Sequence, residues 1–261
     1  MNISWYKLAL GYVLLVIPVI AFYYYRTKLV NPLLVSVLRL SVQLALIGFY
    51  LEYLFKYDSS LLNLAWVILM VTVTAFTVSS RSEVSRHYLA LPLGLSFLTG
   101  LVITEFILLF VVLDLGNVFT ARYLIPITGM ILGNSLNTSI ISLRSYYTGL
   151  VNNDLAYRYL LSTGATPNEA ALPYLRAALK EAFTPVIANA ATIGLVTLPG
   201  MMTGQILGGS SPVTAIKYQI LIMLAIITGT VISVILGIVL SKRFALTELG
   251  MLKPGVMVEN D

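Results

Sequence analysis

Seven long apolar runs constrain the fold of this chain more than any other feature of its sequence. They cover approximately residues 4–25, 33–51, 61–79, 90–113, 123–143, 183–202 and 215–240. About 20 helical residues, each adding about 1.5 Å, cross a hydrocarbon core of about 30 Å. The apolar residues are continuous rather than alternating, which disfavours a β-barrel. We therefore expect an all-α, polytopic membrane protein with seven transmembrane helices in a single domain over residues 1–261.

The amino-acid composition agrees with this interpretation and removes several kinds of site. Of the 261 residues, 58% are hydrophobic and 10% are charged, whereas soluble domains carry roughly 25% charged residues. The chain has no cysteine and one histidine, His87, which excludes thiolate metal sites and histidine clusters. No Gly-Lys dipeptide occurs, so the phosphate-binding GxxxxGK(S/T) loop is absent. We expect no cofactor and no catalytic site in this chain, and an exposed loop position for His87.

The distribution of lysine and arginine predicts the orientation in the membrane, because basic residues accumulate in cytoplasmic loops. Four basic loop residues fall on one side: Lys7, Lys56, Arg122 and Lys217. Eleven fall on the other: Arg26, Lys28, Arg81, Arg86, Arg144, Arg158, Arg176, Lys180, Lys242, Arg243 and Lys253. We therefore expect a multi-pass protein of the plasma (inner) membrane with its N-terminus outside and its C-terminus in the cytoplasm. The net charge of +5 then reflects topology and gives no reason to expect nucleic acid as a partner.

One long polar connection, residues 144–182, separates the fifth and sixth runs on the cytoplasmic side. Within it, Thr166-Pro167-Asn168-Glu169 fits a capping box and predicts a helix that starts at Pro167. Asp154 as an N-cap and Gly164 as a stop signal predict a shorter helix near residues 155–163. Pro173 is expected to kink the second helix. Two capped helices joined by a glycine turn exceed what a plain linker needs, and a plain linker is the alternative.

Three motifs resemble those of a known family. The loop sequence LLSTGATPNEA, from Leu160 to Ala170, looks like the coupling loop of ABC-transporter permeases. The sequences IPITGMILGNSLN (125–137) and TIGLVTLPGMMTGQILGGSSPVTAIKYQI (192–220) resemble the FetB-type permease family. That resemblance implies a seven-helix membrane subunit that pairs with a separate ATPase and exports metal, perhaps iron. It places ATP and Mg²⁺ in the partner and assigns contact with the ATPase to Gly164, Ala165, Thr166, Pro167 and Glu169.

The coupling-loop sequence of this chain differs from that of importer permeases at one motif. These permeases carry Glu-Ala-Ala ahead of the loop glycine, and this chain has Arg158, Tyr159 and Leu160 there. Arguments based on importers, including an external binding protein, are weakened accordingly.

The glycine-rich sequence between the last two runs is a candidate gate. Proline and glycine disfavour regular helix at the outer membrane face, and irregular backbone at membrane depth is tolerated only where it is covered by protein or lines a cavity. A re-entrant element or outer gate is one interpretation and a glycine-rich turn is the other. Met201 and Met202 are weak metal-ligand candidates, because methionine more often fills packing gaps. The gate candidates are Pro199, Gly200, Met201, Met202 and Gln205.

Polar residues inside the apolar runs are candidates for the transport pathway, because they are costly in a membrane. Arg39 and Gln43 share one helical face, and so do Asn134 and Asn137. Glu105 lies alone in the fourth run and is a further weak metal-ligand candidate. For the two asparagines, hydrogen bonds between helices are the alternative to substrate contact. Gly129 and Gly133 form a GxxxG motif that permits close helix contact.

Together these features predict the permease subunit of an ABC transporter. It is expected to act as a homodimer in the lipid bilayer, because two ATPase sites need two coupling surfaces and one chain supplies one. A secondary transporter or channel that works without a motor is the alternative. A membrane enzyme is the least favoured class, because no catalytic constellation is present.

Overall fold

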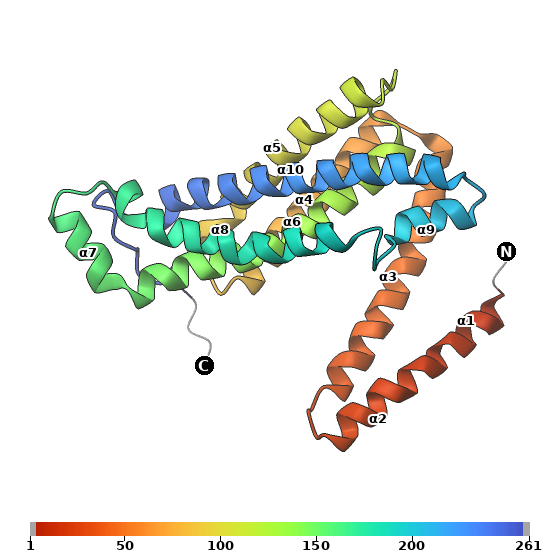
Figure 1. Cartoon of the computed structure of the whole chain (residues 1–261), viewed down its shortest axis with the longest axis horizontal. Coiled ribbons are helices and arrows are strands. Elements are labelled where there is room, and N and C mark those ends of the chain that lie inside the picture. The colour runs from red at the N-terminus through yellow and green to blue at the C-terminus, as the bar shows by residue number, and fades with distance from the viewer. Residues whose placement is uncertain (1–3, 258–261) are drawn as a thin grey trace. The chain divides into compact units, whose positions relative to one another are not determined.

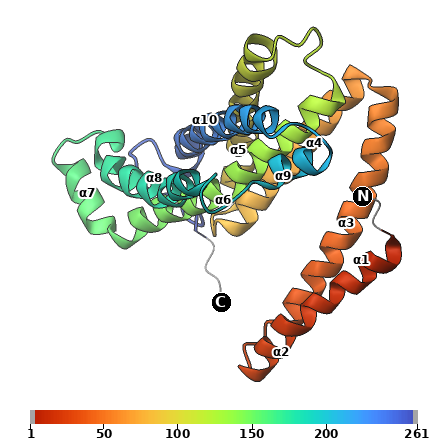
Figure 2. The ribbon, with the colours of Figure 1, turned by 45° about the vertical axis from the view of Figure 1, so that its right-hand side comes forward.

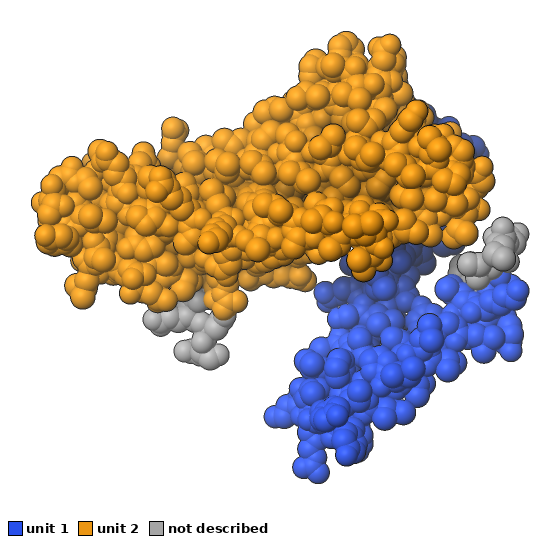
Figure 3. Space-filling model, viewed as in Figure 1, with its two compact units in different colours: residues 1–57 blue, residues 58–261 orange. Residues whose placement is uncertain are grey.

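The computed structural model describes residues 4–257, which form α-helices joined by turns and contain no β-strand element. Figure 1 shows the order of the helices along the chain. The chain divides into two compact units, residues 1–57 and residues 58–261, which Figure 3 shows in different colours. An all-helical membrane protein was the expected class, and the structure confirms it.

The first unit is a pair of apolar helical segments. The first segment combines α1 (Trp5–Gly11), a 3₁₀ turn (Tyr12–Leu15) and α2 (Val16–Tyr24), and the second is α3 (Val30–Tyr57). The chain reverses between them through Arg26 and Lys28, whose φ angles are 50° and 59°. The hydroxyl groups of Tyr12 and Ser41 share a hydrogen bond that joins the two segments.

Six helical stretches among the described residues are long and apolar enough to cross a membrane. The two in the first unit are Tyr6–Tyr24 and Val30–Tyr57. The four in the second unit are Ser60–Arg81, Arg86–Val112, Ala121–Asn152 and Pro212–Ala245. They coincide with six of the seven expected spans, so the chain is a multi-pass membrane protein.

The seventh expected span, residues 183–202, does not form one helix. Helix α8 (Pro167–Thr192) continues through Pro173 and Pro185 and covers the first half of that range. The chain then leaves helical geometry over residues 193–199, where Gly194 has φ = 88° and donates its N–H to the Thr197 carbonyl at 2.9 Å. A short helix, α9 (Gly200–Leu207), follows Pro199. The interruption has a local cause, because the residue before a proline disfavours helical geometry and Gly194 tolerates a positive φ.

The core of the second unit is the packing of α5 (Arg86–Glu105) against α10 (Pro212–Ala245). A π-helical turn (Phe106–Val112) extends α5. Glycine permits the close approach: a Cβ on Gly100 would collide with the Ser233 hydroxyl, and one on Gly229 would lie 3.2 Å from Thr104 Oγ1 of α5. The predicted contact at the GxxxG motif is seen only at Gly129, whose Cβ would lie 3.4 Å from Met70, whereas a Cβ on Gly133 would meet no described atom within 4 Å.

Helices α4 (Ser60–Arg81), α6 (Ala121–Asn152) and α7 (Asp154–Ser162) complete the second unit. Asp58 ties α6 to α4, because one oxygen of its carboxylate accepts both the Ala121 backbone N–H at 2.8 Å and the Asn63 side-chain amide at 3.0 Å. Helices α6 and α8 lie side by side in both ribbon views (Figures 1 and 2). Their shared end at α7 is called the α7 end below, and the end near α9 is called the α9 end.

Candidate coupling element and transport pathway

The connection between α7 and α8 has the local structure that its sequence predicts. Helix α7 ends at Ser162, Gly164 adopts φ = 98°, and α8 begins at Pro167. A positive φ at this position favours glycine, because it costs glycine no steric strain. One expected detail is wrong: Asp154 is the first residue of α7, and Asn153 precedes it as the N-cap.

The capping box at Thr166 is complete. The Thr166 hydroxyl accepts the Glu169 backbone N–H at 3.3 Å, and the Glu169 carboxylate accepts the Thr166 backbone N–H at 2.8 Å. The same carboxylate accepts the Thr166 hydroxyl at 2.7 Å. These hydrogen bonds to the ionised form lower the pKa of Glu169 below its ordinary value. The turn formed by residues 163–166 is therefore held in one conformation, and we call it the coupling turn.

Helices α6 and α8 extend through the predicted connection at 144–182, so most of it is helical. Arg144 pairs with Glu83 at 3.0 Å, and Ser145 donates a hydrogen bond to Glu181. Helix α7 presents apolar side chains to solvent: Leu155 is 86% exposed and Tyr159 is 68% exposed. Exposed apolar groups beside a rigid turn are suited to contact with another protein.

Glu105 is buried at the end of α5 and accepts a hydrogen bond from the Thr128 hydroxyl of α6. No group of three Asp, Glu, His or Cys side chains able to hold a metal ion occurs within residues 4–257. Glu105 therefore has a hydroxyl partner on a neighbouring helix and belongs to no such group of three within the described residues.

The other predicted pathway residues lie on exposed helix faces. Arg39 and Gln43 are exposed on α3 in the first unit. Asn134 and Asn137 are exposed on α6, and the Asn134 amide donates to the Met130 carbonyl of its own helix at 2.9 Å. The hydrogen bond of Asn134 is thus local to its own helix.

Two further polar residues are exposed near the end of α8. The Ser145–Glu181 hydrogen bond joins α6 to α8 at one point. Asn189 and Thr192 follow Glu181 on α8, their side chains are exposed like those of Asn134 and Asn137, and Thr192 is the last residue of α8. Exposed polar side chains are therefore found both on α6 and at the end of α8.

A buried seam of hydroxyl groups was not anticipated. It runs between α6 and α10, where Ser135 and Thr230 share a hydrogen bond of 3.1 Å and the Tyr147 hydroxyl donates to Ser241 at 2.8 Å. The seam consists of these four residues, and further buried hydroxyl groups lie on the same helices: Ser139 and Ser142 on α6, Thr128 on α6 facing Glu105 of α5, and Ser233 on α10 facing Gly100 of α5. Ser135, Ser139 and Ser142 are four and three residues apart, so they share one face of α6, and this spacing can be read from the sequence.

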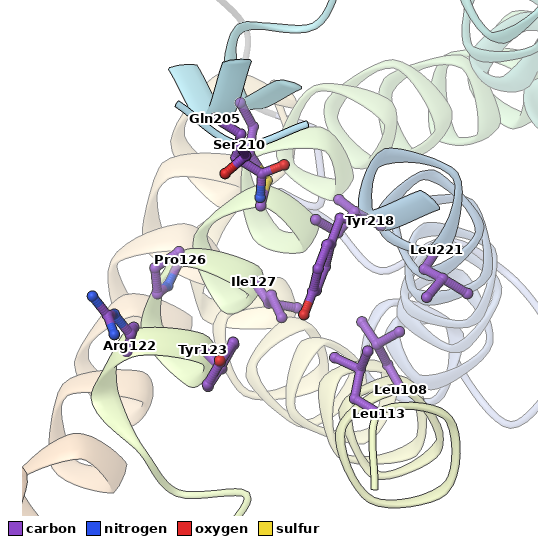
Figure 4. Close-up of a pocket in the computed structure, with 12 residues that line it drawn as sticks. Leu108, Leu113, Arg122, Tyr123, Pro126, Ile127, Gln205, Ser210, Tyr218 and Leu221 are labelled. Carbon is purple, nitrogen blue, oxygen red and sulfur yellow. The ribbon is translucent and has the colours of Figure 1, made fainter. Parts of the chain in front are cut away.

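A cavity of about 450 Å³ lies at the α9 end, between α6, α9, α10 and the turn after α5. Figure 4 shows the Tyr218 ring reaching into it towards Ile127, with Arg122 at one edge and Gln205 and Ser210 at another. Met201 and Gln205, two of the predicted gate residues, line it, whereas Pro199, Gly200 and Met202 do not. The lining also contains Leu108, Leu113, Tyr123, Pro126, Leu221 and Ile222. An apolar wall with a few amide, hydroxyl and guanidinium groups suits a small polar ligand.

Comparison with known proteins gives consistent matches over most of the chain. The model of the uncharacterised protein family UPF0014 matches residues 5–245. Protein ALUMINUM SENSITIVE 3 of Arabidopsis thaliana is 35% identical over 87% of this chain and 82% of its own length. The protein named "Probable iron export permease protein FetB" of Escherichia coli is 31% identical over 93% of this chain and 92% of its own.

The UPF0014 membrane protein STAR2 of Oryza sativa is 35% identical over 81% of this chain and 73% of its own length. No solved structure matches the chain. The family match and the extent of these alignments establish that the chain belongs to the UPF0014 family of membrane proteins.

Proposed function

We propose that this chain is the membrane-spanning permease subunit of an ABC transporter and that a separate ATPase subunit drives it. The observation that carries the proposal is the rigid coupling turn between two helices, with the exposed Leu155 and Tyr159 on α7. A motor that closes on ATP needs a projecting element that does not deform when it is pushed. The capping box and the left-handed glycine give the turn that property.

Helix α8 would carry the movement away from the coupling turn. Its 26 residues correspond to about 39 Å of uninterrupted helix. It carries the exposed Asn189 and ends at Thr192, and α9, which lines the cavity, follows it along the chain. A displacement of the coupling turn would therefore reach the polar residues of the proposed pathway through one rigid element. ATP and Mg²⁺ would bind in the partner subunit.

The proposal includes a topology. The coupling turn faces the cytoplasm of a plasma (inner) membrane, with the N-terminus outside and the C-terminus inside, as the basic residues predict. The second half of α8 together with α9 forms the seventh membrane segment. Helix breaks at membrane depth occur where the backbone lines a cavity, and the cavity beside α9 supports this assignment.

For the substrate we propose metal export, with iron as the first candidate. The name of the Escherichia coli relative supports this choice. Glu105, the amides on α6 and the cavity residues Met201 and Gln205 would line the pathway. Two copies of the chain would be needed to engage two ATPase subunits, because each chain presents one coupling turn.

Co-purification and transport test the proposal together. The chain is expected to co-purify with an ATPase that carries a GxxxxGK(S/T) motif. Inside-out vesicles containing both subunits are expected to accumulate ferrous iron only when ATP and Mg²⁺ are supplied. Vesicles that contain the chain alone and move iron down its gradient without ATP would contradict the proposal and favour a channel or secondary transporter.

A further inference from the structure

The segment that follows α10 is folded back against α7 and the start of α8, the two helices that flank the coupling turn. Residues Leu246–Met257, which we call the C-terminal strap, form a tight reversal directly after Ala245. The Thr247 N–H donates to the Met251 carbonyl at 2.8 Å, and the Lys253 N–H donates to the Ala245 carbonyl at 2.9 Å. Figures 1 and 2 both show this dark blue coil beside α7 and α8. The strap is thus an ordered element attached to the end of α10.

One end of the strap contacts the two helices that flank the coupling turn. The Tyr157 hydroxyl of α7 donates to the Gly250 carbonyl at 2.8 Å, and Tyr157 is 2% exposed. Burial raises the pKa of the Tyr157 phenol, so this group stays protonated and remains a donor. Gly250 has φ = 78°, and a Cβ there would lie 2.8 Å from Pro167 Cγ at the start of α8. Gly250 is therefore in direct contact with α8 and hydrogen-bonded to α7.

The other end of the strap contacts the connection between α4 and α5. The Ser85 N–H donates to the Val256 carbonyl at 2.8 Å, and Val84 pairs with Met257 in an isolated antiparallel bridge. Both Val84 and Val256 are buried. The Lys253 ammonium lies 5.9 Å from the centre of the Tyr88 ring on α5, a favourable cation–π position. The strap therefore joins the coupling region to the start of α5 as well as to the end of α10.

These contacts give the coupling turn two physical connections to the membrane helices. The first connection is covalent: α6 leads into α7 on one side of the turn, and the turn leads into α8 on the other. The other passes from Tyr157 and Pro167 through Gly250 to the strap, and from the strap to α5 and α10. Helices α5 and α10 pack closely on each other at Gly100 and Gly229, so a force on the strap acts on the core of the second unit.

We infer that the C-terminal strap is part of the coupling apparatus, and that Tyr157 and Gly250 are positioning residues that link movement of the coupling turn to α5 and α10. The inference rests on the proposed function and extends it: the ATPase moves α5 and α10 through the strap, in addition to moving α8 directly. Loss of the contact at Gly250 should uncouple ATP hydrolysis from movement at the α9 end while the ATPase still binds.

The test uses a matched pair of glycines in the strap. Gly250 and Gly255 have similar φ angles, 78° and 74°, but a Cβ on Gly255 would meet nothing within 4 Å. Gly250→Ala and Gly255→Ala therefore impose a similar backbone penalty, and only the first disturbs the contact with Pro167. Tyr157→Phe is a second variant that removes one hydrogen bond and keeps the ring. Because the chain has no native cysteine, Tyr218→Cys, on α10 in the cavity, can report movement of α10 by its rate of reaction with an impermeant maleimide.

The full complex with its ATPase is compared in the apo and ATP–vanadate-trapped states. We expect trapping to change the labelling rate of Tyr218→Cys at least threefold in the reference chain and in Gly255→Ala. In Gly250→Ala and Tyr157→Phe we expect most of that change to disappear, with ATPase affinity and basal hydrolysis retained. An unchanged response in Gly250→Ala and Tyr157→Phe would overturn the strap inference and leave the proposed function intact. A reference chain that binds no ATPase would overturn the proposed function and this inference with it.

Discussion

At the scale of single residues, three pairs of buried polar side chains join helices of the second unit. Glu105 on α5 accepts from Thr128 on α6, Ser135 on α6 shares a hydrogen bond with Thr230 on α10, and Tyr147 donates to Ser241. Each pair leaves fewer polar atoms without a partner in an apolar environment, where an unpaired group is costly. These three pairs can therefore fix how α5, α6 and α10 sit against one another.

Thr128→Val tests the value of the Glu105 partner. Valine has the shape of threonine without its hydroxyl, so the substitution leaves a buried carboxyl group without its donor. We expect the free energy of unfolding to fall by about 1–3 kcal/mol, measured by thermal unfolding in detergent. Thr128→Ser, which keeps the hydroxyl, is expected to lose less. A larger loss in Thr128→Ser than in Thr128→Val would show that the methyl group, rather than the hydrogen bond, is what matters.

The sequence predicts the residues of the coupling turn well and the buried partners on other helices poorly, for a physical reason. Gly164, Thr166, Pro167 and Glu169 act through neighbouring backbone, so their short-range pattern determines the turn. The partner of Glu105 comes from a different helix, and no local pattern identifies Thr128. Asn134 and Asn137 were predicted pathway residues because they are polar, but their side chains are exposed. The smaller serine and threonine side chains lie at the helix interfaces instead, because they allow close approach.

At the scale of helices, the difference between local contacts and contacts with distant helices explains which elements could be predicted. Six apolar spans, the glycine turn after α7 and the start of α8 follow from hydropathy and capping signals, whereas the predicted N-cap of α7 was wrong by one residue. Helix α8 contains Pro173, as the sequence predicts, although a proline removes one helical hydrogen bond and often kinks the helix. Contacts of α8 with α6 add stability that the local sequence does not reveal: a Cβ on Gly149 would lie 3.3 Å from Tyr174 Cδ1.

The packing of α5, α6 and α10 gives a prediction about two glycines. Gly229→Ala places a methyl group 2.8 Å from Ile131 Cγ2, whereas Gly133→Ala places one in open space within the second unit. We expect Gly229→Ala to lower the free energy of unfolding by about 1–3 kcal/mol, as overpacking does. Gly133→Ala is expected to be neutral or slightly stabilising, because alanine is the better helix former. Thermal unfolding of both variants checks this, and a larger loss at Gly133 would contradict the packing described for α10.

At the scale of the whole molecule, the account depends on which side of the membrane carries the coupling turn. The eleven basic residues on one side favour the cytoplasm, but hydropathy alone is symmetric and cannot choose a side. His87, expected in a loop, is exposed in the first turn of α5 near the α7 end. Ser60 begins α4 at the opposite end of the unit and is also exposed.

Single cysteines at these two positions decide the orientation. In intact cells, Ser60→Cys is expected to react with a membrane-impermeant maleimide, and His87→Cys is expected to react only after the membrane is permeabilised. The absence of native cysteine removes background labelling. The reverse pattern would place the coupling turn outside the cell, where no ATPase subunit could reach it.

The affinity of the chain for its ATPase when the coupling turn is altered tests the central claim most directly. Gly164 and Gly209 both adopt φ = 98° with nothing within 4 Å of a Cβ, but they lie at opposite ends of the second unit. A β-branched residue is strained at such a φ, so Gly164→Val and Gly209→Val impose the same local penalty in two places. We expect Gly164→Val to weaken ATPase binding at least tenfold and Gly209→Val to leave it unchanged. Unaltered binding in a folded Gly164→Val variant would show that the turn is only a linker and would contradict the account.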